Sequence, residues 1–175
     1  MKKLSMEELG RISPEEYKSA SKNPVILVLD NVRSLHNVGS AFRTADAFFV
    51  EKIYLCGITG TPPNREINKT ALGATESVNW EYVKETNEVV KKLKEEGWTI
   101  ISVEQTDESL SLDKFSPDKT CKYCFVFGNE VFGVDDSVIA LSDLSVEIPQ
   151  YGTKHSLNIS VAIGIVIWDY LSKIK

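Results

Sequence analysis

Residues 148–160 read IPQYGTKHSLNIS, and this stretch joins two apolar segments of the chain. Residues 144–148 before it alternate between apolar and polar side chains, as a strand does, and the segment after it is apolar. A proline and a glycine inside the stretch predict a loop. The loop has no acidic residue but several donors and small polar side chains, namely Lys154, His155, Ser156 and Asn158. Because ligands of α/β domains bind where strands lead into helices, this loop is a candidate functional site.

Short apolar runs elsewhere in the chain predict strands that are buried on both faces, which is typical of a parallel sheet. The predicted strands are residues 25–30 (VILVLD), 52–57, 77–83, 98–103, 123–127 and 144–148. Segments with apolar residues at helical spacing lie between them, and the predicted helices are residues 38–49, with Asn37 as N-cap, 66–73, 86–96, 134–141 and 156–172. This alternation predicts one α/β domain over residues 24–175, with a mostly parallel sheet and helices on both faces.

The first 23 residues are polar and contain a helix-start signal, SPEE, at residues 13–16. We expect a short helical arm there and not a separate domain. The last predicted helix differs from the others because it is apolar on nearly every side. A helix that is apolar on several faces must be covered on several faces, so we expect a partner subunit to cover part of it.

The totals place the chain among ordinary globular domains, since 175 residues suffice for one domain with a real core. The first ten residues have no apolar segment of the secretory type, and the longest apolar run, residues 159–168, is shorter than the ~20 residues of a membrane span. We therefore expect a cytoplasmic protein without a membrane partner. The three cysteines include one C-x-x-C pair, Cys121 and Cys124, which without a second pair favours reduced structural thiols over a metal or redox site.

The net charge of −5 argues at first against a nucleic-acid partner, but the charges are unevenly distributed. Residues 31–43 and 150–160 carry basic side chains and no acid, and residues 57–70 carry Arg65 and Lys69 against one acid. Three of the four arginines fall in these loop-like stretches. The pattern favours phosphate-binding loops, while an ordinary mixed surface remains the alternative.

Several common motifs are absent from the sequence. It has no G-x-G-x-x-G after the first strand, no P-loop and no G-x-S-x-G, so these nucleotide and hydrolase sites are not expected. His36 and His155 stand alone without metal-ligand spacing, and we expect no metal. Residues 128–133 (GNEVFG) directly follow a predicted buried strand, which is compatible equally with a tight turn and with a backbone that approaches a ligand.

Three blocks, each just after a predicted strand, resemble the motifs of the SpoU/TrmH family of SPOUT methyltransferases. The first is N-x-G-x-x-x-R at residues 37–43 (NVGSAFR), the second is GNEVFG at residues 128–133, and the third is Ile148-Pro149 followed by SLNISVA at residues 156–162. Each block alone is weak, but the three in this order are specific, and the resemblance covers about residues 24–172.

The resemblance implies a C-terminal trefoil knot, a homodimer, and S-adenosylmethionine held largely by main-chain groups. By motif position, the cofactor contacts would be Gly128, Ile148 and Leu157. It further implies methyl transfer to a ribose 2′-hydroxyl of RNA, with a catalytic group formed by Asn37, Arg43, Glu130, Ser156 and Asn158. Phosphate contacts would come from Arg33, His36, Arg65, Lys69 and Lys154.

The role of the motif arginine stays open at this point. In the family, the residue that Arg43 matches is proposed to assist deprotonation of the hydroxyl. Because an arginine pKa lies above about 12, Arg43 could instead hold a phosphate or stabilise the forming alkoxide.

The RNA also stays open between tRNA and rRNA. Compared with some members of the family, the chain has only a short N-terminal arm and no basic C-terminal extension, which slightly favours tRNA as a compact substrate. Two other functions compete with this interpretation: a non-catalytic RNA-binding or ribosome-assembly protein on the same fold, and a methyltransferase that acts on a base.

Overall fold

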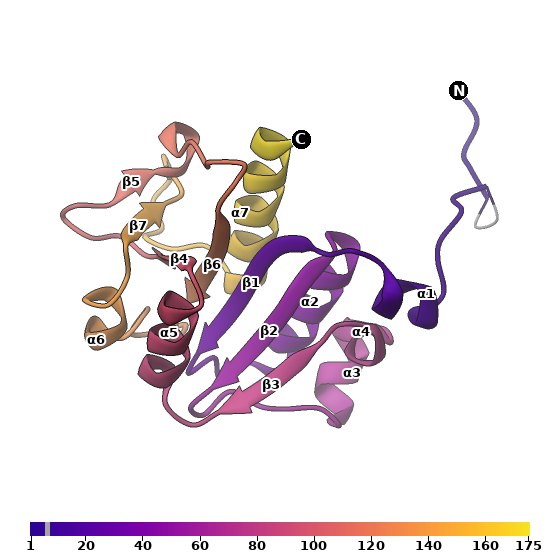
Figure 1. The fold of residues 1–175 in the computed structure, drawn as a ribbon, viewed down its shortest axis with the longest axis horizontal. Coiled ribbons are helices and arrows are strands. Elements are labelled where there is room, and N and C mark those ends of the chain that lie inside the picture. Colours follow the sequence, from indigo (N-terminus) through magenta and orange to yellow (C-terminus); the bar gives the residue numbers. More distant parts are fainter. Residues whose placement is uncertain (6–7) are drawn as a thin grey trace.

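A single seven-stranded sheet organises the chain in the computed structural model, which describes residues 1–5 and 8–175 (Figure 1). All strand pairs are parallel, and the strand order is β3-β2-β1-β6-β4-β7-β5. The strands are β1 (Asn23–Asp30), β2 (Val50–Cys56), β3 (Trp80–Val83), β4 (Trp98–Val103), β5 (Leu110–Ser111), β6 (Lys122–Phe127) and β7 (Leu144–Glu147). The predicted α/β domain with a parallel sheet is confirmed, and β1, β6 and β4 form its buried centre.

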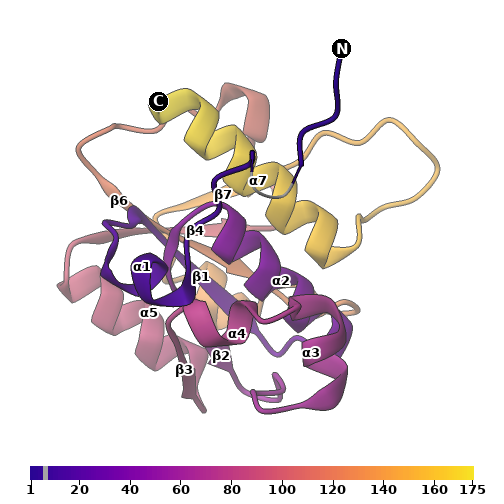
Figure 2. The same cartoon turned by 90° about the vertical axis from the view of Figure 1, so that its right-hand side faces the viewer.

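Helices cover both faces of the sheet, which explains why the central strands are apolar on both sides (Figures 1 and 2). One core lies under α2 (Leu35–Ala47), α3 (Arg65–Ala71), α4 (Ala74–Ser77) and α7 (Ile159–Ile174). The opposite core lies under α5 (Thr86–Glu95) and α6 (Asp136–Ile139). Alternate residues of β1 enter the two cores, with Leu27 on the α2 side and Val28 on the α5 side.

The N-terminus of α2 differs from the prediction. Asn37 is not the N-cap, because the hydroxyl oxygen of Ser34 accepts a hydrogen bond from the Asn37 backbone N–H at 3.3 Å and the helix begins at Leu35. Asn37 therefore lies in the first turn, where its side chain is free to bond elsewhere. The sequence offered two good capping residues three positions apart, and the upstream one is used.

Other boundaries also moved. The last helix begins at Ile159 and not at residue 156, because Asn158 is its N-cap and the preceding residues form a loop. Residues 74–77, part of which was assigned to the third strand, form α4. The two-residue strand β5 and the 3-10 turn η1 (Leu112–Lys114) were not predicted.

A close contact between α2 and α3 depends on Gly39. A Cβ atom at this position would lie 2.2 Å from the Ile67 carbonyl oxygen and 2.2 Å from the Thr70 Oγ1. The Thr70 hydroxyl donates to the His36 carbonyl at 2.9 Å across the same contact. The motif glycine thus lets α3 pack directly on α2 and fixes the two helices relative to each other.

The predicted N-terminal helix is α1 (Pro14–Ser19), with Ser13 and Glu16 in a capping box. It packs on the domain through Tyr17, which is buried, stacks on Phe49 at 4.8 Å and donates from its hydroxyl to the Ala45 carbonyl at 3.2 Å. Residues 6 and 7 of the expected arm lie outside the described residues. Among the helices of the described chain, none is long and apolar enough to cross a membrane.

Candidate active site

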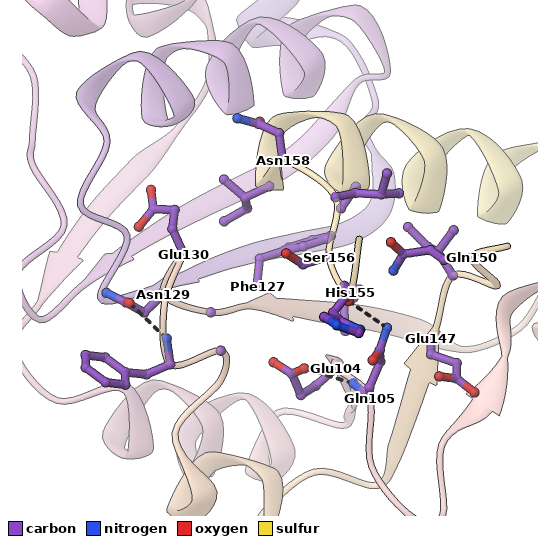
Figure 3. Close-up of a pocket in the computed structure, with 18 of the residues that line it drawn as sticks. Glu104, Gln105, Phe127, Asn129, Glu130, Glu147, Gln150, His155, Ser156 and Asn158 are labelled. Atoms are coloured by element: carbon purple, nitrogen blue, oxygen red, sulfur yellow. Dashed lines mark hydrogen bonds between the residues drawn. The ribbon is translucent and has the colours of Figure 1, made fainter. Parts of the chain in front are cut away.

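A cavity of about 560 Å³ opens at the carboxyl ends of β4, β6 and β7 (Figure 3). Its walls are the segments that follow these strands and the beginning of α7. Asn129 and Glu130 lie toward one end of the cavity, and Glu147 and Gln150 lie toward the other. This is the edge at which ligands of parallel α/β sheets bind.

Six of the residues that the sequence singled out line this cavity together, namely Gly128, Glu130, Ile148, Ser156, Leu157 and Asn158. They come from two segments that are far apart in the chain, residues 128–130 and residues 148–158. The described lining does not include Asn37 and Arg43, which lie on the neighbouring helix α2. The structure therefore separates the predicted site into a cavity and a helix beside it.

The loop at residues 128–133 is held in one conformation by its own backbone and by Asn129. The backbones of Asn129 and Gly133 exchange two hydrogen bonds of 2.8 and 2.9 Å. A Cβ atom on Gly128 would lie 2.1 Å from the Gly133 carbonyl carbon, so only glycine fits where the loop folds back on itself. The Asn129 amide donates to the Asn31 carbonyl at 2.8 Å, which ties the loop to the segment after β1. The structure shows the tight turn and places it at the wall of the cavity, and the approach of this backbone to a ligand stays a prediction.

Glu130 connects this loop to the start of α2. Its carboxylate accepts hydrogen bonds from the backbone N–H groups of Arg33 and Ser34, both at 3.0 Å, and from the side-chain amide of Asn37 at 3.1 Å. Partial burial acts to raise the pKa of Glu130, but the donors of Arg33, Ser34 and Asn37 outweigh it and lower the pKa below its usual range. Glu130 is thus an ionised acceptor that joins the cavity to α2.

Glu104 is a second fixed carboxylate of the cavity, and the sequence analysis missed it. It follows β4 directly, and it accepts from the backbone N–H groups of Val134 at 3.0 Å and Gln105 at 2.9 Å. The Gln105 amide in turn donates to the His155 carbonyl at 3.2 Å, across the cavity (Figure 3). The sequence did contain a signal for Glu104, because it directly follows a predicted strand. The rule that ligands bind at the carboxyl ends of parallel strands, which selected the other lining residues, applies to it as well.

The charge of the lining is one-sided. It contains three carboxylates, Glu104, Glu130 and Glu147, and no lysine or arginine among its described residues. The remaining walls are apolar or neutral, with Val103, Leu157 and other aliphatic side chains beside main-chain groups. Such a cavity suits a small molecule with a positive charge and an apolar part, and it does not suit a phosphate-bearing nucleotide.

Asn158 and Ser156 have different surroundings. The Asn158 side-chain oxygen accepts from the Ser160 backbone N–H at 2.8 Å and from the Ser160 hydroxyl at 2.6 Å, so it caps α7 while it lines the cavity. Ser156 is exposed in the preceding loop, facing the cavity (Figure 3). Asn158 therefore fixes the point at which α7 begins beside the cavity.

A basic ridge lies outside the cavity, and we use this name for the exposed residues Arg33, His36, Arg43, Arg65 and Lys69 of α2, α3 and the segment before α2. Glu66 contacts two of them, since its carboxylate lies 2.7 Å from Lys69 Nζ and 3.1 Å from His36 Nε2. Hydrogen bonds from Lys69 and His36 lower the pKa of Glu66. Exposed pairs of this kind are weak and can be exchanged for a phosphate. Lys154, also exposed, is on the loop before α7 and not on the ridge.

The cysteines form no reactive site. Cys56 and Cys124 are buried, and burial raises the pKa of Cys56 to about 12 and that of Cys124 further still. Cys121 is half-buried, and all three are free thiols. Within residues 1–5 and 8–175, no group of three or more His, Cys, Asp or Glu side chains could hold a metal ion.

The fold and the cavity together define an α/β domain that can hold a small cationic ligand at the carboxyl ends of parallel strands, beside a basic ridge. Residues 24–168 match the SpoU rRNA Methylase family, and the chain belongs to this family. The expected family is thereby confirmed.

Individual relatives agree with this assignment. The chain is 33% identical over 150 residues to the 23S rRNA (guanosine-2′-O-)-methyltransferase RlmB of Neisseria meningitidis, covering 86% of this chain and 59% of that protein. The crystal structure of the Aquifex aeolicus TrmH/SpoU tRNA modifying enzyme is similar, with a TM-score of 0.80 and 28% identity over 91% of this chain and 79% of that one. The SpoU methyltransferase AviRb of Streptomyces viridochromogenes, solved in complex with AdoMet, shares the fold, with a TM-score of 0.78 and 19% identity over 90% of this chain and 63% of that one.

Proposed function

We propose that the protein transfers a methyl group from S-adenosylmethionine to a ribose 2′-hydroxyl of tRNA or rRNA. The observation that carries this proposal is the contact of Glu130 with Asn37 and with the N–H groups of Arg33 and Ser34. It joins a cavity that suits a cationic ligand to the helix that presents Arg43. The names of the Neisseria and Aquifex relatives, an rRNA 2′-O-methyltransferase and a tRNA modifying enzyme, support both kinds of RNA.

The cavity residues fit the cofactor by charge. S-adenosylmethionine, when bound, supplies a methyl group on a positively charged sulfonium. Main-chain groups at Gly128, Ile148 and Leu157 would hold it, as the family motifs imply, and all three residues line the cavity. The carboxylates of Glu104, Glu130 and Glu147 would favour its positive charge over a neutral or phosphorylated competitor.

The ridge residues would position the RNA. Arg33, Arg65 and Lys69 are exposed cations that can contact phosphates, His36 is an exposed donor beside them, and Lys154 can do the same from the loop before α7. Asn37 is held by Glu130 and can orient the ribose or Arg43. Because a guanidinium is a cation with several N–H donors, we assign Arg43 an electrostatic role: it stabilises the hydroxyl oxygen as the proton leaves.

We further infer a cytoplasmic homodimer with the trefoil knot of the family. An apolar stripe of α7 supports the dimer: Val161, Ile165 and Trp168 are 49%, 37% and 64% exposed at helical spacing. Light scattering at micromolar concentration should give the mass of two chains, and Trp168→Glu should lower it. A monomeric wild-type protein would contradict the dimer.

The direct test of the function is incorporation of labelled methyl from S-adenosylmethionine into separately purified, unmodified tRNA and rRNA. We expect one of the two pools to accept the label. Cofactor binding should be measured in parallel by calorimetry. Cofactor binding without transfer to either pool would indicate a missing partner or a particle substrate, and no cofactor binding would favour the non-catalytic alternative.

A further inference from the structure

An exposed aromatic side chain stands at the mouth of the cavity and has no role in the function described above. Phe132 is 86% exposed, and its neighbour Val131 is 65% exposed. Both residues line the cavity from the loop at residues 128–133. In this motif, roles are predicted for Gly128 and Glu130 and none for these two residues.

The loop fixes Phe132 in this outward position. The Asn129 side-chain oxygen accepts from the backbone N–H groups of Val131 at 2.8 Å and Phe132 at 3.2 Å. The paired backbones of Asn129 and Gly133 close the loop on either side of it. The backbone that carries the aromatic ring is therefore held by a hydrogen-bonded turn, so the loop itself need not be ordered when a ligand packs against the ring.

The same loop contacts the place where RNA is expected. Glu130, two residues before Phe132, accepts from the N–H groups of Arg33 and Ser34 at the start of the basic ridge. The ridge itself offers exposed cations, and contacts of such cations with phosphates carry no information about the base. A ribose presented to the cavity must bring its own base and the neighbouring bases to the cavity mouth.

We propose that Phe132 is a stacking platform for an unpaired base of the RNA, at or next to the nucleotide that receives the methyl group. This inference rests on the proposed function. Unpaired RNA bases are commonly bound by stacking on aromatic side chains, and such a contact tolerates different bases while it fixes the nucleotide in place. Phe132 is thus a positioning residue that brings the ribose to the cavity.

The test compares Phe132→Leu, which keeps an apolar side chain but removes the aromatic face, with Phe132→Trp, which keeps the face. Tyr82→Leu is the matched control, because Tyr82 is an exposed aromatic residue on β3, outside the described lining of this cavity. With the RNA pool that accepts the label, Phe132→Leu should raise KM for RNA roughly 5- to 150-fold, as expected for one lost stacking contact. Phe132→Trp and Tyr82→Leu should stay near the wild type, and the Kd for S-adenosylmethionine should not change in any variant.

A binding experiment isolates the base from the phosphates. An oligoadenylate and an abasic ribose-phosphate oligomer of the same length carry the same charge, so a difference in affinity between them reports contacts with the bases. We expect the wild-type protein to bind the oligoadenylate more tightly. Phe132→Leu should remove this preference, and Phe132→Trp should keep it.

Three results would overturn the inference. The first is an active wild-type protein together with a Phe132→Leu variant whose KM for RNA equals that of the wild type, and the second is a preference for the oligoadenylate that survives in Phe132→Leu. The third is a lower molecular mass of Phe132→Leu in light scattering, which would place the residue in a subunit interface. A wild-type protein that binds the oligoadenylate but transfers no methyl group would contradict the proposed function and leave the stacking result to be judged by binding alone.

Discussion

The cavity and the basic ridge are neighbours with opposite charge. The described lining of the cavity has three carboxylates and no lysine or arginine, whereas the ridge exposes three arginines, a histidine and a lysine. A net charge of −5 conceals this separation, because acidic residues elsewhere in the chain outweigh the ridge. The difference indicates two ligands of opposite charge, a cationic small molecule and a polyanion, that meet where Glu130 joins the two regions. If the two regions have separate tasks, substitutions in one should leave the ligand of the other bound.

The largest effect is expected from Arg43→Ala. Arg43 is exposed on α2 and does not belong to the described lining of the cavity, so the variant should lose about 100-fold or more in methyl transfer while its Kd for S-adenosylmethionine stays nearly the same. Transfer kinetics and calorimetry measure the two quantities. Arg11→Ala removes the same group from an exposed position of the N-terminal arm and should behave like the wild type. An Arg43→Ala protein that is still active, or one that no longer binds the cofactor, would contradict the assignment of separate tasks to the ridge and the cavity.

A smaller effect is expected from Glu130→Gln, which weakens the connection between the two regions. The amide offers one acceptor oxygen where the carboxylate offers two, so one of the contacts to Arg33, Ser34 and Asn37 is lost together with the charge. Transfer should fall about tenfold, as expected for the loss of one charge-assisted hydrogen bond. Glu108→Gln, an exposed glutamate on the loop after β4, is the control. Full activity in Glu130→Gln would mean that cavity and ridge do not need this link.

A modest effect is expected on the salt dependence of RNA binding. Lys154→Ala should weaken binding a few-fold and reduce the slope of log K against log salt by about 1, because one phosphate contact is removed. Lys91→Ala, on the exposed side of α5, should leave the slope unchanged. The slope is measured by titrations at several salt concentrations. An affinity of the wild type that does not depend on salt would contradict the role of the basic residues.

The smallest effect is expected from mild acid. The pKa of Glu130 is lowered in the folded protein, so the stability that this group contributes is fully present above its ordinary value of 4.5 and is lost only as the pH falls through the lowered pKa. The difference in unfolding free energy between wild type and Glu130→Gln should therefore be constant from about pH 7 to about pH 5 and shrink below that range. Denaturant unfolding of both proteins at several pH values measures this difference. A difference that already decreases near pH 6 would contradict the lowered pKa of Glu130 and the hydrogen bonds that cause it.

Local sequence signals predicted the central strands but not every boundary. β1, β4 and β6 were predicted because strands buried on both faces have continuous apolar runs. The start of α2 was misplaced because Ser34 and Asn37 are both residue types that cap helices well, and Ser34 is the one that does so. The side chain of Asn37 instead donates to Glu130, which is 93 residues away in the chain. The two-residue strand β5 exists only through its pairing with β7 and leaves no pattern of its own.

The cavity was predicted better than the contacts that support it. Gly128, Ile148 and Leu157 lie in motifs that follow strands, and the structure brings them to one cavity. Glu104 and the links made by Glu130 and Asn129 are tertiary contacts between distant segments, and no periodicity in the sequence reveals such contacts. Phe132 shows the same limit, because a single aromatic residue in a loop can be buried or exposed and only the fold decides which.

The measurement that tests the central claim most directly is the position of the transferred methyl group. A methyl group on the ribose 2′-oxygen blocks alkaline cleavage of the adjacent phosphodiester, so label from S-adenosylmethionine should appear in alkali-resistant dinucleotides and, after enzymatic digestion, in a 2′-O-methylnucleoside. Label that alkali releases as a mononucleotide with a methylated base would contradict the account. The cavity and ridge would then serve a methyltransferase that acts on a base.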